Sequence, residues 1–254
     1  MIVTVHQPHY LPWLGYLHRM ATADLFILLD HVQFERRNYQ NRTMIRMTGA
    51  NGAEGRWLTV PVVQHSQKET IVEKQVDNML HGTPRWWSAA HFQTLRHAYR
   101  DAGFLSPYVG ELRRIFEARW NRLVDLNHAT LELLRDAFGI RTPIVRSSEL
   151  GANGAKADLI LNLCREVGAD VLLAGLGGSR DYLDAEAFAR EGVSIAYQIF
   201  RHPQYAQCGS GFVPGLSSLD LLLNCGPASR GLLLGENVGG SAVGTAQHES
   251  RVAA

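Results

Sequence analysis

Short apolar runs alternate with amphipathic segments along this 254-residue chain, a pattern that predicts strands alternating with helices. Residues 2–5, Ile-Val-Thr-Val, form a β-branched run typical of a buried strand. Apolar residues three apart favour a helix over residues 14–22, and the apolar run at 24–30 predicts a second strand. Strand, helix and strand in this order indicate a parallel sheet covered by helices.

The middle of the chain changes from this alternation to a mainly helical pattern. Residues 57–63 still predict a strand. Helical spacing then extends over about residues 83–139, where Gly103 and Pro107 predict breaks between two or three helices and Gly139 a terminating cap. We therefore expect a helical insertion that packs against the sheet.

After residue 140 the alternation of strands and helices resumes. The pattern predicts helices over residues 157–167, 184–190 and 217–223, and strands over residues 169–175 and 193–200. We predict the α/β class: one domain over residues 1–238 with a parallel-type sheet core and a helical subdomain at about 83–139. Residues 239–254 hold Gly, Ser and Ala but few large apolar side chains, which predicts a disordered tail.

Charge and cysteine usage limit the classes of partner. Twenty-five basic against 24 acidic side chains give a net charge of +1, too little to gather nucleic acid or an acidic membrane surface. No apolar stretch approaches the roughly 18 residues that span a bilayer, and the first residues do not follow a signal-peptide pattern. Cys164, Cys208 and Cys225 lack CxxC spacing, which predicts free thiols. We expect a cytoplasmic protein.

The first candidate site follows the first predicted strand. Residues 6–13 read His-Gln-Pro-His-Tyr-Leu-Pro-Trp, so His6 and His9 lie at the strand end, where parallel sheets form their binding crevices. Histidine acts as base, acid or charged anchor near neutral pH. The alternative interpretation is a rigid turn made by the two prolines, with both histidines bonded to the backbone.

Two other chemistries suit the same loop. The His-x-x-His spacing is similar to that of HIGH-motif nucleotidylyl transferases, although the glycine before their second histidine is missing here. A metal site assembled from His6, His9, Asp30 and His31 lacks any recognised ligand spacing, so we predict no metal.

Basic and glycine-rich segments offer anion-binding groups. Asn41 and Arg42 follow the second predicted strand, and an arginine grips phosphate or carboxylate with two parallel hydrogen bonds. The neighbouring Arg46 suits an ordinary solvated face equally well. Residues 175–182 follow another strand, and their glycines allow backbone amides to approach an anion, or simply form a loop.

The last candidate cluster follows the strand predicted at 193–200. His202 takes the same topological position as His6 and His9, so we expect all three at one sheet edge. Cys208, six residues on, is a candidate nucleophile for thioester chemistry. The alternative is an inert packing residue, which describes most unpaired cysteines.

Taken in order, these segments resemble the WbqC-like protein family over roughly residues 1–230. The matching pieces are HQPHYLPWLGYL at 6–17, DHVQF at 30–34, NR at 41–42, WLTVPV at 57–62, LNHATLELLRDAFGI at 126–140, SSEL at 147–150, GSRDYLD at 178–184, HPQYAQ at 202–207 and LSSLDLLLNCG at 216–226. The resemblance implies an accessory enzyme of surface-polysaccharide or specialised-metabolite biosynthesis. Some members accompany pathways to amino sugars that carry aminoacyl groups on nitrogen.

We therefore expect transfer of an acyl or aminoacyl group to an amine or amino-sugar acceptor, without a cofactor. The donor would be a thioester or aminoacyl ester, possible carriers being a carrier protein or an aminoacyl-tRNA. The alternatives are a nucleotidyl transferase and a non-catalytic binding or scaffold protein. The predicted catalytic residues are His6, His9 and His202; the predicted substrate-binding residues are Gln7, Tyr10, Asn41, Arg42, Tyr182, Tyr205 and Gln207.

Overall fold

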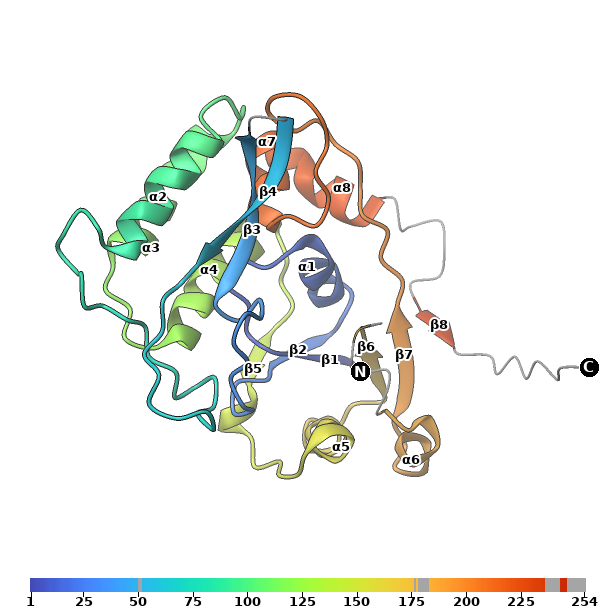
Figure 1. Ribbon diagram of the computed structural model, residues 1–254. Helices are drawn as coiled ribbons and strands as arrows, with labels where there is room; N and C mark the ends of the chain where they lie inside the picture. Colours follow the sequence, from blue (N-terminus) through green and yellow to red (C-terminus); the bar gives the residue numbers. More distant parts are fainter. Residues whose placement is uncertain (50–51, 176, 178–182, 236–242, 246–254) are drawn as a thin grey trace, which may run out of the picture.

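The computed structural model, which describes residues 1–49, 52–175, 177, 183–235 and 243–245, contains a six-stranded sheet (Figure 1). The strand order is β5-β2-β1-β6-β7-β8, with every pairing parallel except β7 with β8. The strands are β1 (Ile2–His6), β2 (Leu25–Leu28), β5 (Ile144–Arg146), β6 (Val171–Ala174), β7 (Ser194–Gln198) and β8 (Val243–Thr245). The predicted α/β class with a parallel core is confirmed.

Helices cover both faces of the sheet, as the alternating pattern requires. On one face lies α1 (Leu14–Ala21); on the other lie α5 (Lys156–Glu166) and α6 (Ala185–Arg190) (Figure 1). Side chains on β2 alternate between the two cores, because successive strand residues point to opposite faces. Ile27 packs in the α5–α6 core, whereas Phe26 and Leu28 pack with α1.

The strand order places a switch point between β1 and β6. The chain leaves β1 outward to β2 and β5, then crosses back to the other side of β1 to form β6 and β7. Connections from β1 and β6 therefore diverge to opposite faces of the sheet. In doubly wound sheets the resulting crevice at the carboxyl ends of the strands is where ligands bind.

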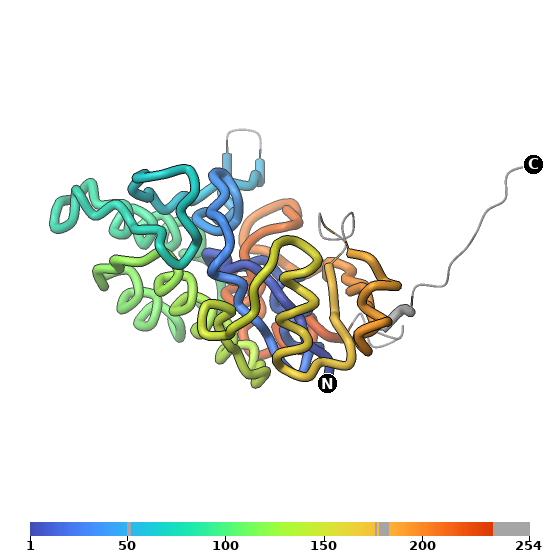
Figure 2. The backbone as a smooth tube through the Cα atoms, turned by 90° about the horizontal axis from the view of Figure 1, so that it is seen from below, coloured from blue at the N-terminus to red at the C-terminus, as the bar shows by residue number. Residues whose placement is uncertain are grey.

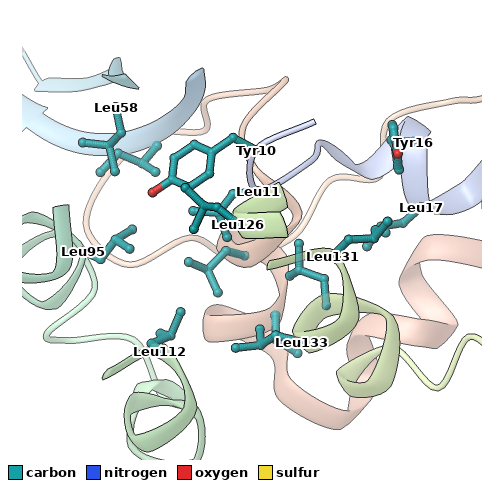
Figure 3. Packing of buried hydrophobic residues seen from close by; sticks show 14 of the residues in the cluster. Tyr10, Leu11, Tyr16, Leu17, Leu58, Leu95, Leu112, Leu126, Leu131 and Leu133 are labelled. Atoms are coloured by element: carbon teal, nitrogen blue, oxygen red, sulfur yellow. The ribbon is translucent and has the colours of Figure 1, made fainter. Parts of the chain in front are cut away.

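The predicted helical insertion is present as three helices. They are α2 (Trp87–Ala98), α3 (Leu105–Glu117) and α4 (Leu123–Ala137). Figure 2 shows this insertion, teal to green, on one side of the molecule and residues of about 150–200 on the other. Its leucines, Leu95, Leu112, Leu126 and Leu133 among them, share one core with the loop after β1 (Figure 3). That core fixes the loop carrying the candidate site.

Glycine and proline residues in the insertion predict where its helices end. Gly139 ends α4 as predicted: its φ is +63°, its amide bonds to Asp136, and the next amide bonds to Arg135, the pattern of a glycine C-cap. The break predicted by Gly103 with Pro107 is present at residues 99–104: Gly103 lies within it, and Pro107 lies in the first turn of α3, where an amide has no intrahelical partner to lose. The second break falls at residues 118–122.

An antiparallel hairpin of β3 (Arg42–Gly49) and β4 (Gly52–Thr59) forms a separate two-stranded sheet. The strand predicted at 57–63 corresponds to β4, which starts five residues earlier and ends four residues earlier. The segment with Arg42 and Arg46, described above as basic, forms β3. Arg46 is only 3% exposed rather than solvated, because its guanidinium donates to the Ser210 carbonyl. A contact between residues 164 positions apart in the sequence, rather than the local charge pattern, therefore decides the burial of Arg46.

The rest of the chain adds short helical elements. The first, η1 (Ser147–Glu149), directly follows β5, whereas α7 (Ser218–Cys225), η3 (Gly226–Ala228) and α8 (Ser229–Gly235) follow one another, and the leucines of α7 and α8 pack in the core on the α1 side of the sheet. No described helix is both long and apolar enough to cross a membrane. In the tail predicted at 239–254, residues 243–245 form β8, and the other residues lie outside the described part of the chain.

Candidate functional site

A cavity of about 850 Å³ lies at the carboxyl ends of β1, β6 and β7, at the switch point of the sheet. Residues from both faces of the sheet line it, since α1 contributes Arg19 and α5 contributes Ile160. Its polar and aromatic lining includes His6, Gln7, Trp13, Arg19, Gln198 and Phe200. The cavity therefore occupies the position that the strand order assigns to a ligand.

His6, the last residue of β1, reaches the cavity wall with a defined tautomer. Its Nδ1 lies 3.0 Å from the Gln7 carbonyl oxygen. A carbonyl only accepts, so Nδ1 carries the proton and Nε2 keeps its lone pair. The ring packs against His9 and Tyr16 with centroids 4.5 and 4.6 Å away. His6 is thus held as a proton acceptor at the cavity wall.

Gln7 follows His6 in the chain and has its amide oriented by a second glutamine. The Gln40 Nε2 donates to the Gln7 Oε1 over 2.9 Å. Gln40 is fully buried, its Oε1 accepts from the Glu35 amide, and its backbone carbonyl accepts from Asn127. The Gln7 carbonyl is therefore engaged, and its NH₂ group keeps its donors for the cavity.

Arg19 places a buried cation on the same wall. The residue is 7% exposed, and burial lowers its pKa to about 10, so the guanidinium stays charged at neutral pH. Its Nε has no hydrogen-bond partner within the described part of the chain. The sequence pattern does not predict a role for Arg19, because a lone arginine in the last turn of a helix gives no signal of burial.

Gln198 and two aromatic rings complete the wall at the end of β7. The Gln198 Nε2 donates to the Gly15 carbonyl (2.8 Å) and to the His18 Nδ1 (2.9 Å). Both amide hydrogens are therefore engaged by α1, and Gln198 lines the cavity in this fixed orientation. Trp13 and Phe200 meet edge to face beside it, with centroids 5.7 Å apart.

The structure brings His9 against His6 but buries it. The His9 ring lies near Tyr16 and Tyr39, with centroids 5.1 and 5.4 Å away, and its Nδ1 has no partner. Burial lowers the pKa of His9 to about 3, so the ring is neutral at pH 7. A neutral ring behind His6 suits packing and orientation of His6.

His202 belongs to a different cluster, beyond Phe200. Its Nδ1 donates to the Pro203 carbonyl (2.8 Å), and its Nε2 accepts from the Gly215 amide (3.2 Å). Both ring nitrogens are therefore occupied within the folded chain, unlike those of His6. This arrangement ties the loop after β7 together and leaves no free lone pair for proton transfer.

Tyr205 and Gln207 converge on a buried carboxylate instead of the cavity. Both donate to the Asp220 Oδ2, over 2.7 and 2.9 Å, and Asp220 is fully buried at the start of α7. Burial raises the pKa of Asp220 above its usual range, although these donors oppose the shift. The network anchors the loop after β7 to α7.

The other described residues predicted to bind substrate are not among those that line this cavity. Tyr10 is fully buried among the leucines of the core that the helical insertion shares with the loop after β1 (Figure 3). Its hydroxyl lies 3.0 Å from the His91 Nδ1. Asn41 donates to the Val60 carbonyl over 2.9 Å. The Arg42 guanidinium carbon stacks 4.1 Å from the Trp57 ring centroid. Tyr182 lies outside the described residues.

Cys208, the candidate nucleophile, is half-buried in the core formed with the helical insertion. Its Sγ lies 3.6 Å from the Ala98 carbonyl oxygen. Burial, with the Asp220 charge nearby, raises the pKa of the thiol. A raised pKa keeps the sulfur protonated and disfavours nucleophilic attack.

A second polar cluster joins the ends of β2 and β5. The buried Asp30 carboxylate accepts from the Ser147 hydroxyl (3.1 Å) and from both the amide and the hydroxyl of Ser148 (2.9 Å each). The His31 Nδ1 lies 2.7 Å from the Ser147 Oγ. The carboxylate binds the serines rather than the imidazole, unlike a catalytic triad, so the cluster fixes η1. No three His, Cys, Asp or Glu side chains converge like metal ligands within the described residues.

Comparisons with known proteins agree with the sequence pattern. A sequence model of the WbqC-like protein family matches residues 7–231. A protein of Mycobacterium tuberculosis (strain ATCC 25618 / H37Rv), described as uncharacterized protein Rv1507c, is 29% identical over 226 residues, 88% of this chain and 94% of the relative. No solved structure matches the chain significantly.

Proposed function

The chain belongs to the WbqC-like protein family, and we propose that it is an enzyme that transfers an acyl or aminoacyl group to an amine acceptor. One observation carries the proposal. His6 and Gln7 line the switch-point cavity side by side, with the His6 Nδ1 bonded to a carbonyl oxygen and the Gln7 Oε1 bonded to Gln40. In a neutral His6 ring the lone pair is then on Nε2, and the Gln7 side chain has its NH₂ group left as a donor. Direct acyl transfer to nitrogen requires a general base for the amine proton and a hydrogen-bond donor that stabilises the oxyanion.

The reaction would proceed by direct attack. The amine nitrogen attacks the carbonyl carbon of the donor while its proton passes to the His6 Nε2. The carbonyl electron pair moves onto oxygen, and the Gln7 N–H donors stabilise the resulting oxyanion. When the tetrahedral adduct collapses, the carbon–sulfur or carbon–oxygen bond breaks, and the leaving thiolate or alkoxide takes the proton back from His6.

The cavity lining supports a reaction of this type. Leu29, Leu172 and Ala174 give it apolar walls beside the polar groups. An apolar surround limits the access of water, which would otherwise hydrolyse an activated acyl donor. We propose a thioester or aminoacyl ester as donor, on a carrier protein or an aminoacyl-tRNA, and an amino sugar as acceptor, in agreement with the pathways that the family resemblance implies.

A second candidate, nucleotidyl transfer, is favoured by the strand order. Counting only the parallel strands in chain order, the sheet reads 3-2-1-4-5, the order of mononucleotide-binding sheets, with His-x-x-His directly after the first strand. Against this, the second histidine of that pair is buried behind the first and is neutral at pH 7. This candidate requires Mg²⁺ and a nucleoside triphosphate.

One experiment separates these candidates and a non-catalytic binding protein. The protein is incubated with thioester and aminoacyl-ester donors plus amino sugars, and separately with nucleoside triphosphates, Mg²⁺ and labelled pyrophosphate. Amide formation, detected by mass spectrometry, supports acyl transfer; exchange of pyrophosphate into triphosphate supports nucleotidyl transfer instead. Binding without either product supports a scaffold.

Variants assign the activity to the site. His6→Ala should lose at least the roughly hundredfold acceleration typical of a general base. His97→Ala, a change at an exposed position of α2, is the matched control and should stay within about twofold of the wild type. Equal activity of His6→Ala and wild type, with both folded, contradicts the proposal.

A further inference from the structure

We infer that Arg19 forms an oxyanion-binding subsite in the switch-point cavity, which takes a phosphate or carboxylate group of the substrate. The inference rests on the proposed function only in treating this cavity as the place where the substrate reacts. It adds the substrate class: one of the two reactants carries an anionic group close to the reacting carbonyl or amine.

The burial of Arg19 is the first observation. Only 7% of the residue is exposed, and its pKa of about 10 leaves it protonated across the physiological range. A buried guanidinium without a counter-charge is destabilising, since it loses its hydration without gaining an ion pair. A bound anion would supply the missing counter-charge and offset this cost.

The surroundings of Arg19 are the second observation. Among the described residues its Nε has no hydrogen-bond partner, and none of the ion pairs involves its guanidinium. The acidic residue described in the cavity lining, Glu35, is exposed, and its Oε2 accepts from Asn38. Arg19 therefore lines the cavity without an ion-pair partner in the described part of the chain, and its Nε is a donor that no described residue uses.

Gly175, the residue after β6, lets the guanidinium take this position. A Cβ atom added at Gly175 would lie 2.5 Å from the Arg19 Nη1, so any side chain there would require the guanidinium to move. Gly175 is not among the glycines with positive φ, so its conformation itself does not require glycine. Glycine here therefore serves the close approach between strand end and arginine.

The ligand chemistry follows from the geometry of the group. A planar guanidinium pairs with a phosphate or carboxylate through two parallel hydrogen bonds, and exclusion of water strengthens the pairing. His6, Gln7 and Arg19 line one cavity of about 850 Å³, so the anion and the reacting group belong to molecules that meet there. A phosphorylated donor and a carboxylate-bearing acceptor share this chemistry.

Binding of simple anions tests the subsite without any knowledge of the substrate. Inorganic phosphate, pyrophosphate and acetate are titrated at constant ionic strength against chloride, with heat of binding and melting temperature as readouts. We expect Arg19→Met to bind the preferred anion at least about tenfold more weakly than the wild type. Preference for phosphate or for acetate distinguishes a phosphorylated ligand from a carboxylate.

Matched variants keep the test decisive. Arg100→Met, a change at an exposed arginine, should bind the anion like the wild type. Arg19→Lys keeps the charge and should retain part of the binding, and Gly175→Ala should weaken it by displacing the guanidinium. Binding by a folded Arg19→Met that equals the wild type overturns the inference.

The same variants, assayed for both anion binding and amide formation, distinguish failure of the subsite from failure of the proposed function. Anion binding that depends on Arg19, without amide formation from any donor, contradicts acyl transfer and leaves the subsite standing. Amide formation at the wild-type rate by Arg19→Met, with unchanged anion binding, contradicts the subsite alone.

Discussion

The Gln40 side-chain amide donates to the Gln7 Oε1 over 2.9 Å, and this bond decides which end of the Gln7 amide faces the cavity. An amide group has one acceptor end and one donor end, so engaging the acceptor leaves the donor free. Gln40 is itself fixed by the Glu35 amide and by Asn127. It is a positioning residue for an oxyanion donor.

Gln40→Leu should therefore lower kcat by about tenfold or more with little change in KM. Without its partner the Gln7 amide rotates, and part of the oxyanion stabilisation, which a single donor gives at about 10²–10³-fold, is lost. Gln40→Glu should act likewise, because a carboxylate accepts from the Gln7 NH₂ group and turns it away from the cavity. Steady-state kinetics check this, with Gln93→Leu, at an exposed position of α2, as the control.

A rise in KM at constant kcat in Gln40→Leu would contradict this account. That pattern would assign Gln7 to ground-state binding rather than to the transition state.

Stability should fall as pH drops below about 6.5, because several buried histidines stay neutral in the folded chain. Burial lowers the pKa of His9 to about 3 and of His91 to about 4. In the unfolded chain each titrates near 6.5, so below that pH the unfolded state binds more protons. Each group then costs about 1.4 kcal/mol per pH unit until its folded pKa is reached.

Denaturant unfolding between pH 7.5 and 4.5 measures this dependence. His91→Gln should reduce the slope by about one proton, whereas Gln93→Ala, a change at an exposed position of the same helix, should leave it unchanged. An identical slope for His91→Gln and wild type would show that His91 is not neutral in the fold.

The thiols should be dispensable for catalysis. Burial raises the pKa of Cys208, and it raises that of Cys164 to about 12, so neither is a ready thiolate. Cys208→Ala should retain activity within about tenfold, with folding checked by circular dichroism. An inactive but folded variant, together with an acyl group trapped on Cys208 in the wild type, would replace direct transfer by a ping-pong route.

Asp220 should matter for stability. Asp220→Ala leaves the buried donors of Tyr205 and Gln207 without their acceptor, which costs about 1–3 kcal/mol. For a chain of this size each kcal/mol lowers Tm by about 2–4 °C. Asp101→Ala, at a surface position, is the control for calorimetry. An unchanged Tm in Asp220→Ala would show that the network contributes nothing.

Much of the fold follows from local pattern. β1, α1, β6 and β7 are predicted because apolar periodicity and strand-end turns lie within a few residues of each other. Asp184 and Ser217 cap α6 and α7 as their positions suggest, since an N-cap bond reaches only two or three residues ahead. β3 is not predicted, because its basic residues suggest a solvated segment. Packing against residues far along the chain, such as Ser210, buries Arg46.

The residues of the site likewise divide into those that local sequence pattern predicts and those that only tertiary packing brings to the cavity. Strand-end reasoning predicts His6 and Gln7, and the structure places both at the cavity. The same reasoning predicts His202, whose loop instead folds back on its own backbone. Arg19 and Gln40 belong to the site only because of tertiary packing. The position of Arg19 in a helix, and of Gln40 among basic residues, does not indicate in the sequence that either lies near the cavity.

The central claim is that His6 is held as the Nδ1-protonated tautomer, with Nε2 free as the base. Long-range ¹H–¹⁵N NMR of protein labelled with ¹⁵N-histidine, recorded at about pH 8, reports which ring nitrogen carries the proton. The signals of His6 are those that disappear in His6→Gln, and His97 serves as an exposed reference. The account predicts a protonated Nδ1 and an unprotonated Nε2 for His6, while His97 exchanges between tautomers. A proton on the His6 Nε2 would contradict it, because the nitrogen assigned to the amine proton would already be occupied.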